Sequence, residues 1–261
     1  MLKPRITPCL LIQDGGLVKT IKFKDPKYIG DPINAVRIFN EKEADELIVL
    51  DIDASINGVE PDYKMIENLA KECRMPLCYG GGISNLDQAK EIVSLGVEKI
   101  ALSSIIFENP GLISEISETI GSQSVSVVLD IKKKAFSKDY NVWIFNGKIN
   151  TKKNAVEIIE LIQKLGVGEI ILNFIDFDGL MTGYPIKIVK DLKKYIKTPM
   201  TIMGGASSIE NMRDTVMQCG LMGVAAGSLF VFKGKYRAVL INYPSLQQKK
   251  EFVYGQKYFQ R

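Results

Sequence analysis

Three residues of this sequence have both the chemistry and the setting to move protons. Asp130 ends the apolar run Val125–Asp130, and Asp178 follows the apolar run Glu169–Asn173. Lys19 supplies a cation near the N-terminus. A partly desolvated carboxylate beside a lysine or a phosphate can act as a general acid or base. We therefore expect Asp130, Asp178 and Lys19 to be the catalytic residues.

Three more aspartates follow apolar runs of the same kind. Asp51 and Asp53 come at the end of the run Glu46–Ile52, and Asp176 comes two residues before Asp178. Aspartate in such places also caps helices and stabilises loops. We expect all three near the site, and for Asp53 and Asp176 the sequence leaves a structural role equally open.

The composition excludes several kinds of chemistry. Histidine is absent from the 261 residues, which excludes a histidine-based triad, imidazole acid–base catalysis and a histidine-ligated zinc site. The four cysteines form no Cys-x-x-Cys pair, and scattered thiols are typical of reduced, buried residues. Catalysis must then rest on carboxylates, lysines, thiols or backbone dipoles. We expect no metal and no cofactor.

The charge and the hydropathy limit the partners. The net charge of +4 suits an anionic small molecule and is too weak to indicate nucleic acid. The N-terminus has no apolar stretch of signal-peptide length, and no run approaches the roughly 20 apolar residues that a membrane span needs. We expect a cytoplasmic protein with neither a nucleic-acid nor a membrane partner.

Glycines stand in pairs at two places where an apolar run gives way to a helical pattern. Gly81 and Gly82 form one pair, and Gly204 and Gly205 form the other. Glycine lets backbone N–H groups approach an anion closely, and the start of a helix favours negative charge. Further donors expected beside the glycine pairs are Ser103, Ser104, Gly179, Gly227 and Ser228.

The glycine pairs also have a simpler explanation, because glycine serves tight turns between a strand and a helix. A single pair would favour that explanation, whereas two pairs at matched positions favour anion binding. The pattern predicts a ligand with two phosphates, or with one phosphate and another anion, held between the two pairs.

Eight short apolar runs alternate with longer amphipathic segments along the chain. Buried strands flanked by helices predict a parallel sheet covered on its outer side, and eight is the number that a closed barrel needs. We predict an α/β fold, a (β/α)8 TIM barrel, with an open doubly wound sheet as the alternative. The expected strands are Arg5–Ile12, Glu46–Ile52, Pro76–Tyr79, Lys99–Leu102, Val125–Asp130, Glu169–Asn173, Met200–Met203 and Gly223–Ala226. The expected helices include Asp62–Cys73, Leu86–Leu95, Ala155–Leu165, Ile186–Tyr195 and Ile209–Gln218.

The sequence repeats itself at about half its length. Pro76–Ser104 and Pro199–Ser228 share glycines followed by serine and an end rich in small residues, and Glu46–Asp53 is echoed by Glu169–Asp176. The repeat predicts two half-barrels of four βα units each. It excludes a domain boundary in the middle, so we expect one domain over residues 1–261.

Four charged residues fall at the starts of expected strands: Arg5, Glu46, Lys99 and Glu169. They should surround the N-terminal pole of the barrel, opposite the ligand. Their balanced signs indicate an ion-pair plug, and the residues alone favour a role in stability.

The sequence resembles the cyclase subunit of imidazole glycerol phosphate synthase from Arg5 to about Phe232. The resemblance implies a half-barrel duplication, a substrate with two phosphates, and a glutaminase partner on the N-terminal face whose ammonia travels through the barrel. The four charges at that pole then become the gate of an ammonia tunnel, which replaces the stabilising role. The matching residues are Pro8-Cys9-Leu10, Asp14-Gly15, Lys19, Gly30-Asp31-Pro32, Ala44-Asp45-Glu46-Leu47, Leu50-Asp51-Ile52, Gly80-Gly81-Gly82-Ile83, Gly96, Lys99, Gly168-Glu169-Ile170, Ile175-Asp176, Asp178-Gly179, Gly183, Gly204-Gly205-Ala206 and Ala225-Ala226.

One departure from the family pattern changes the expected activity. The cyclase uses two aspartates, at the ends of its first and fifth strands; the second is present as Asp130, but Leu11 stands in the first position. Leucine cannot exchange a proton, and the loss of a positioned acid–base group typically costs ~10²–10⁴ in rate. The ordinary cyclisation of histidine biosynthesis should therefore be crippled.

The sequence looks closer to a paralogous branch of the family. Residues 19–28 and 237–244 resemble members associated with bacterial surface-polysaccharide clusters, where the protein helps to form an acetamidino group on a sugar. We therefore expect an ammonia-using subunit that acts on an amino-sugar nucleotide or another phosphorylated small molecule. An authentic histidine-pathway cyclase, which is a lyase, and a non-catalytic conduit that activates the glutaminase are the alternatives.

Overall fold

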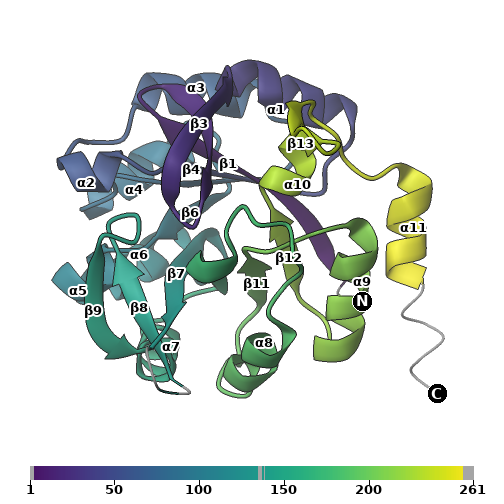
Figure 1. Ribbon diagram of the computed structural model, residues 1–261. Coiled ribbons are helices and arrows are strands. Elements are labelled where there is room, and N and C mark those ends of the chain that lie inside the picture. Colours follow the sequence, from purple (N-terminus) through teal and green to yellow (C-terminus); the bar gives the residue numbers. More distant parts are fainter. Residues whose placement is uncertain (1–2, 135–136, 138, 255–261) are drawn as a thin grey trace.

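The computed structural model describes residues 3–134, 137 and 139–254, and these contain a closed barrel of eight parallel strands (Figure 1). Each strand pairs in parallel with its two neighbours, and the last pairs with the first, with Arg5 opposite Gly223. The prediction of a (β/α)8 barrel is confirmed, and the open-sheet alternative is wrong. Around the barrel the strands are β1 (Arg5–Gln13), β4 (Leu47–Asp51), β5 (Leu77–Gly80), β6 (Lys99–Leu102), β7 (Val125–Lys133), β10 (Glu169–Phe174), β11 (Met200–Met203) and β12 (Gly223–Ala226).

Helices follow the strands and cover the outside of the barrel (Figure 1). Their ends follow local capping: Asp62 accepts a hydrogen bond from the backbone N–H of Met65, so the helix expected from Asp62 begins one residue later. No helix in the described part of the chain is long and apolar enough to cross a membrane. The α-helices are α1 (Pro32–Glu41), α2 (Ala54–Asn57), α3 (Tyr63–Glu72), α4 (Leu86–Ser94), α5 (Ile105–Glu108), α6 (Gly111–Ile120), α7 (Ala155–Lys164), α8 (Ile186–Lys193), α9 (Ile209–Cys219), α10 (Ser228–Val231) and α11 (Leu246–Tyr254), and the 3₁₀ helices are η1 (Ser122–Ser124) and η2 (Ile175–Phe177).

Side chains alternate along each barrel strand, so every strand contributes to two cores. The outward side chains pack beneath the helices and form the larger core. The inward side chains fill the barrel, which makes its interior a packed layer and not an open pore. The buried residues of this inner core, one from each strand, are Cys9, Ile48, Cys78, Ala101, Val128, Ile171, Met203 and Ala225.

Two antiparallel hairpins extend the barrel, one after its first strand β1 and one after its fifth strand β7 (Figure 1). Their matched positions extend the half-barrel repeat. We expected neither hairpin from the sequence, because the second strand of each is polar and partly exposed and lacks an apolar pattern. The antiparallel strands are β2 (Gly16–Ile21), β3 (Lys24–Gly30), β8 (Tyr140–Ile144) and β9 (Ile149–Asn154), and a short later pair is β13 (Phe232–Lys233) and β14 (Ala238–Val239).

The chain beyond the last barrel strand returns to the N-terminal pole. The Tyr243 hydroxyl donates to the carbonyl oxygen of Ile6 at 2.7 Å and accepts from the backbone N–H of Asp45 at 3.1 Å. Lys249 forms an ion pair with Asp45 at 2.9 Å. These contacts fix the C-terminal segment against the starts of β1 and β4.

Candidate active site at the mouth of the barrel

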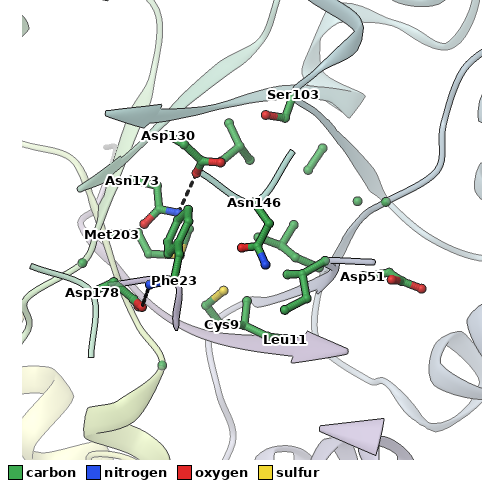
Figure 2. Close-up of a pocket in the computed structure, with 18 of the residues that line it drawn as sticks. Cys9, Leu11, Phe23, Asp51, Ser103, Asp130, Asn146, Asn173, Asp178 and Met203 are labelled. Carbon is green, nitrogen blue, oxygen red and sulfur yellow. Dashed lines mark hydrogen bonds between the residues drawn. The ribbon is translucent and has the colours of Figure 1, made fainter. Parts of the chain in front are cut away.

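A cavity opens at the carboxyl ends of the barrel strands, where barrel enzymes bind their ligands. It holds about 1180 Å³ of empty space, its open side included. Lys19, Asp130 and Asp178 line it, together with Leu11 and Asp51, and Figure 2 shows the three aspartates and the leucine around it. The glycines and serines expected to bind phosphate line the same cavity: Gly81, Gly82, Ser103, Ser104, Gly179, Gly204, Gly205, Gly227 and Ser228.

Asp130 is a buried carboxyl on the inward face of β7. The side-chain amide of Asn173 on β10 donates to its Oδ1 at 2.8 Å (Figure 2). Burial and, to a lesser extent, the charge of Asp178 raise the pKa of Asp130 to about 7, against the lowering effect of the Asn173 hydrogen bond. A carboxyl that titrates near neutral pH can both give and take a proton under physiological conditions.

Asp178 lies on the loop after β10 and is held by the first hairpin. The Thr20 hydroxyl donates to its Oδ2 at 2.7 Å, and the backbone N–H of Phe23 donates to the same oxygen at 3.2 Å. Burial raises the pKa of Asp178 despite these donors and the charge of Lys19. The β2–β3 hairpin and the loop after β10 therefore form one wall of the site.

Lys19 lies on β2, so the hairpin carries the cation into the cavity. The ammonium group donates to the carbonyl oxygen of Cys9 at 2.6 Å, and burial lowers the pKa of Lys19. A carbonyl partner leaves the positive charge unneutralised. A Cβ atom on Gly227 would lie 2.5 Å from the Lys19 nitrogen, so the charge faces the loop after β12.

The two glycine pairs adopt backbone conformations that other residues rarely tolerate. Gly81 and Gly82 have φ values of 132° and 73°, and Gly204 and Gly205 have φ values of 95° and 109°. Cβ atoms there would also meet neighbouring backbone, for Gly82 the carbonyl oxygen of Val59 at 2.7 Å. The turns therefore require glycine at these four positions, as the simpler explanation held. Anion binding is compatible with this requirement, because all four glycines line the cavity.

The loops around the glycine pairs match in detail. Asn85 caps α4 and Ser208 caps α9, each three residues after the second glycine of its pair. The backbone N–H of Ser84 donates to the Gln88 side chain, as that of Ser207 does to the Asn211 side chain. The repeat seen in the sequence is therefore a repeat of loop structure.

These loops form two sets of donors, which follow barrel strands four places apart and so face each other across the cavity. We call them the first cup (Gly81, Gly82, Ser103 and Ser104) and the second cup (Gly204, Gly205, Gly227 and Ser228). Lys19 lies beside the second cup and Gly179 lies near it on the loop after β10.

The structure does not bring Asp53 and Asp176 to the cavity lining, contrary to expectation. Asp53 accepts a hydrogen bond from the Gln13 side chain at 3.2 Å, and Asp176 accepts one from the backbone N–H of Lys133 at 3.3 Å. Both carboxylates stabilise loops. Asp51 lines the cavity, but its carboxylate accepts from the backbone N–H groups of Asp53 and Ala54, both at 3.0 Å.

Sequence reasoning missed the aromatic and amide residues at the tips of the two hairpins. Phe23 and Phe145 both line the cavity with Asn146, and all three have left-handed backbone, with φ values of 61°, 52° and 53°. Figure 2 shows Phe23 and Asn146 reaching over the site. Strained backbone of this kind gathers at functional sites. These residues could have been identified from the sequence only after the two hairpins had been predicted.

The four charges at the N-terminal pole form a closed set of ion pairs, which we call the charged ring. Arg5 pairs with Glu46 at 3.3 Å and also with Glu169, and Lys99 pairs with Glu46 at 2.6 Å and Glu169 at 2.9 Å. Glu46 and Glu169 are buried. Burial opposes the ionised form, yet the charges of Arg5 and Lys99 hold the pKa of Glu169 below its usual range.

Two buried hydroxyl groups lie inside the barrel just above the charged ring. Thr7 follows Arg5 by one inward position on β1, and Ser126 lies opposite Glu169 across β7 and β10. Within the residues that the structure describes, neither side-chain oxygen has a hydrogen-bond partner. Buried hydroxyls normally have one, so these two are able to bind a small polar molecule.

A (β/α)8 barrel with polar residues gathered in a cavity at the carboxyl ends of its strands has the layout that barrel enzymes share. The model of a family described as histidine biosynthesis protein matches residues 5–237. The chain belongs to this family, and within it to the branch of HisF-type cyclase subunits, as the sequence resemblance indicated.

Relatives distinguish the two branches of that family. A protein of Leptospira borgpetersenii provisionally named imidazole glycerol phosphate synthase subunit HisF is 57% identical over 96% of this chain and 98% of its own length. The protein provisionally named subunit hisF2 of Pseudomonas aeruginosa is 48% identical over 95% of this chain and 98% of its own length. Imidazole glycerol phosphate synthase subunit HisF of Clostridium botulinum is 34% identical over 89% of this chain and 92% of its own length. The chain is a member of the paralogous branch.

Proposed function

We propose that this chain is the ammonia-using subunit of a two-protein synthase. A glutaminase docks on the N-terminal face, ammonia passes along the barrel axis, and a phosphorylated small molecule receives it at the mouth. The substrate carries two phosphates or is a nucleotide sugar. The biological role is amidino-sugar formation for a surface polysaccharide.

One observation carries this proposal: the buried carboxyl of Asp130, whose pKa burial raises to about 7, lines a cavity with a donor cup on each side. The two cups suit the two ends of a diphosphorylated substrate, and Lys19 adds a cation beside the second cup. Asp130 lies on the inward wall between the cups, where it can accept a proton from an attacking amine. Asp178 adds a second carboxylate on the same side.

The proposed ammonia route is supported by the layers of the barrel axis. The charged ring lies at one end, Thr7 and Ser126 lie above it, and the apolar inner core leads to the mouth. Neutral ammonia can cross an apolar layer, whereas an ammonium ion would pay a large desolvation cost. The two unpartnered hydroxyls provide hydrogen bonds where ammonia leaves the charges, and the inner core keeps water from following.

Leu11 supports a reaction different from the histidine-pathway cyclisation. It lies on the inward face of β1 and packs with Leu50 against the inner core, so an apolar side chain stands where the family pattern has its first aspartate. Asp130 lies on β7, four places further round the ring of barrel strands. The acid–base groups of the proposed reaction are then Asp130 and Asp178, without a carboxylate at position 11.

Leu11 also favours a second candidate, a non-catalytic conduit that only activates the glutaminase. A pure conduit needs no titratable group at the mouth and should tolerate the loss of Asp130. The Asp130 variant described in the Discussion separates the two candidates.

The glutaminase partnership has a direct test. We expect a glutaminase co-expressed from the same organism to co-purify with this chain and to hydrolyse glutamine roughly tenfold faster in its presence, because the two sites are coupled through the barrel. Glutamate release is the measurement, with the glutaminase alone as the control. If no candidate glutaminase gains activity from the chain, the ammonia route loses its support.

A further inference from the structure

The outer end of the β7–β8–β9 sheet carries a second groove, separate from the mouth. Four lysines, two asparagines and a tryptophan line it, and no carboxylate is among its described lining residues. Trp143 is the one tryptophan of the 261 residues. The lining residues are Lys132, Lys133, Lys134, Asn141, Trp143, Asn150 and Lys152.

The groove lies on the same face of the sheet as Asp130. Asp130 lies opposite Trp143 across β7 and β8, and Lys132 lies opposite Asn141. Residues directly opposite on antiparallel strands share a face of the sheet, with Cβ atoms about 4.5–5.5 Å apart. The face that presents Asp130 to the mouth therefore presents Trp143 next and Lys132 beyond it.

The floor of the groove is fixed by hydrogen bonds. The side-chain amide of Asn141 donates to Asn150 Oδ1 at 3.3 Å, and the backbone N–H of Lys152 donates to the same oxygen at 2.8 Å. Asn141 is buried although its groups are polar. The Lys132 ammonium lies 5.0 Å from the centre of the Trp143 ring.

An irregularity in β9 places Lys152 in the groove. Trp143 pairs with Asn150 but Asn141 pairs with Asn154, so β9 holds extra residues opposite β8. Lys152 lies in this bulge with a φ of 58°. Bulges turn a side chain to a new direction and occur beside active sites. Lysines on an edge strand also prevent pairing with other chains, but that role needs neither the tryptophan nor the asparagine pair.

We infer that this groove binds a nucleoside diphosphate group on the face of the sheet that also carries Asp130. An indole ring offers a surface on which a nucleobase stacks, and lysines around it neutralise phosphates. The Asn141 and Asn150 amides can meet the polar edge of the base. The biological meaning of this site rests on the proposed function, since it makes a nucleotide sugar the substrate class; the binding itself does not.

The single tryptophan gives this site its own signal. With UDP as the probe and excitation of Trp143, we expect saturable quenching of the fluorescence in the intact protein. Lys152→Ala should weaken the affinity roughly five- to tenfold, because one charge-assisted contact to phosphate is lost. Lys153→Ala is the matched control, since Lys153 is the exposed neighbour on β9 outside the groove lining. Its affinity for UDP should equal that of the unmodified protein.

The inference is overturned if UDP causes no saturable quenching, if Lys152→Ala and Lys153→Ala cause equal losses of affinity, or if a single-stranded oligonucleotide binds more tightly than UDP. Ser104→Asp and Ser228→Asp alter only the mouth and should leave the affinity for UDP unchanged. If these two variants lose affinity for UDP, then UDP binds in the mouth, which also contradicts the inference. Glutaminase activation is measured separately, so a chain that activates the glutaminase but ignores UDP retains the proposed function.

Discussion

Asp130→Asn should stabilise the fold above pH 7 while abolishing most of the activity. Burial raises the pKa of Asp130 from 3.8 to about 7, so the folded protein holds a proton that the unfolded chain releases. The contribution of the protonated Asp130 carboxyl to stability is fully present below pH 3.8 and is lost as the pH rises through 7. Above pH 7 the buried charge costs up to about 4 kcal/mol, and asparagine removes that cost. The measurement is urea unfolding at pH 4.5 and pH 8, where the gain should be small and large respectively.

The same variant should lose about 10²–10⁴ in ammonia-dependent turnover, since asparagine cannot accept a proton. Asp176→Asn is the matched control: Asp176 follows a barrel strand as well, but it does not line the cavity. Full activity of Asp130→Asn together with normal glutaminase activation would identify the chain as a conduit. Equal stability of the variant and the unmodified protein at pH 8 would show that Asp130 is not a buried, near-neutral acid.

Lys99→Met should destabilise the protein by about 3–5 kcal/mol at pH 7, because it leaves Glu46 and Glu169 buried with Arg5 as their common partner. The double variant Lys99→Met with Glu46→Gln should recover part of the loss by removing one stranded charge. The lowered pKa of Glu169 stabilises the unmodified protein above its unfolded pKa, and this contribution disappears as the pH falls. The penalty of Lys99→Met should therefore shrink in acid.

Unfolding in urea measures these differences, with Lys90→Met as the control. Lys90 pairs with Asp87 at 3.9 Å on an exposed helix surface, and the loss of such a pair costs about 0–1 kcal/mol. A Lys99→Met penalty as small as that of Lys90→Met would mean that the charged ring is not a coupled, buried network. A double variant less stable than the single one would contradict the account in the same way.

The barrel strands could be predicted because a buried parallel strand is a continuous apolar run. Lys99–Leu102, Met200–Met203 and Gly223–Ala226 have the predicted bounds. The prediction for β7 ended at Asp130, but the strand continues to Lys133. The last two residues, Lys132 and Lys133, are polar and are held in the sheet by pairing with β8, which is a contact that the local sequence pattern does not show.

In general, a residue of the site could be predicted where the strand that carries it could be predicted. Asp130 and the glycine pairs lie directly at strand ends, so their places could be inferred from the strands. Lys19 was expected in the site, but the strand that carries it was not. Phe23, Asn146 and Trp143 depend on hairpins whose second strands are polar and partly exposed, so the hairpins were not predicted.

The central claim is that one ligand is held at both ends by two facing cups. The most direct measurement is a calorimetric titration with fructose 1,6-bisphosphate of the unmodified protein, of Ser104→Asp and of Ser228→Asp. The unmodified protein should bind one molecule per chain, and each variant should weaken binding by a similar factor, roughly 10- to 100-fold, because each introduces a negative charge into one cup. If neither serine variant alters binding, or if one alone does, the ligand does not span the mouth and the account is contradicted.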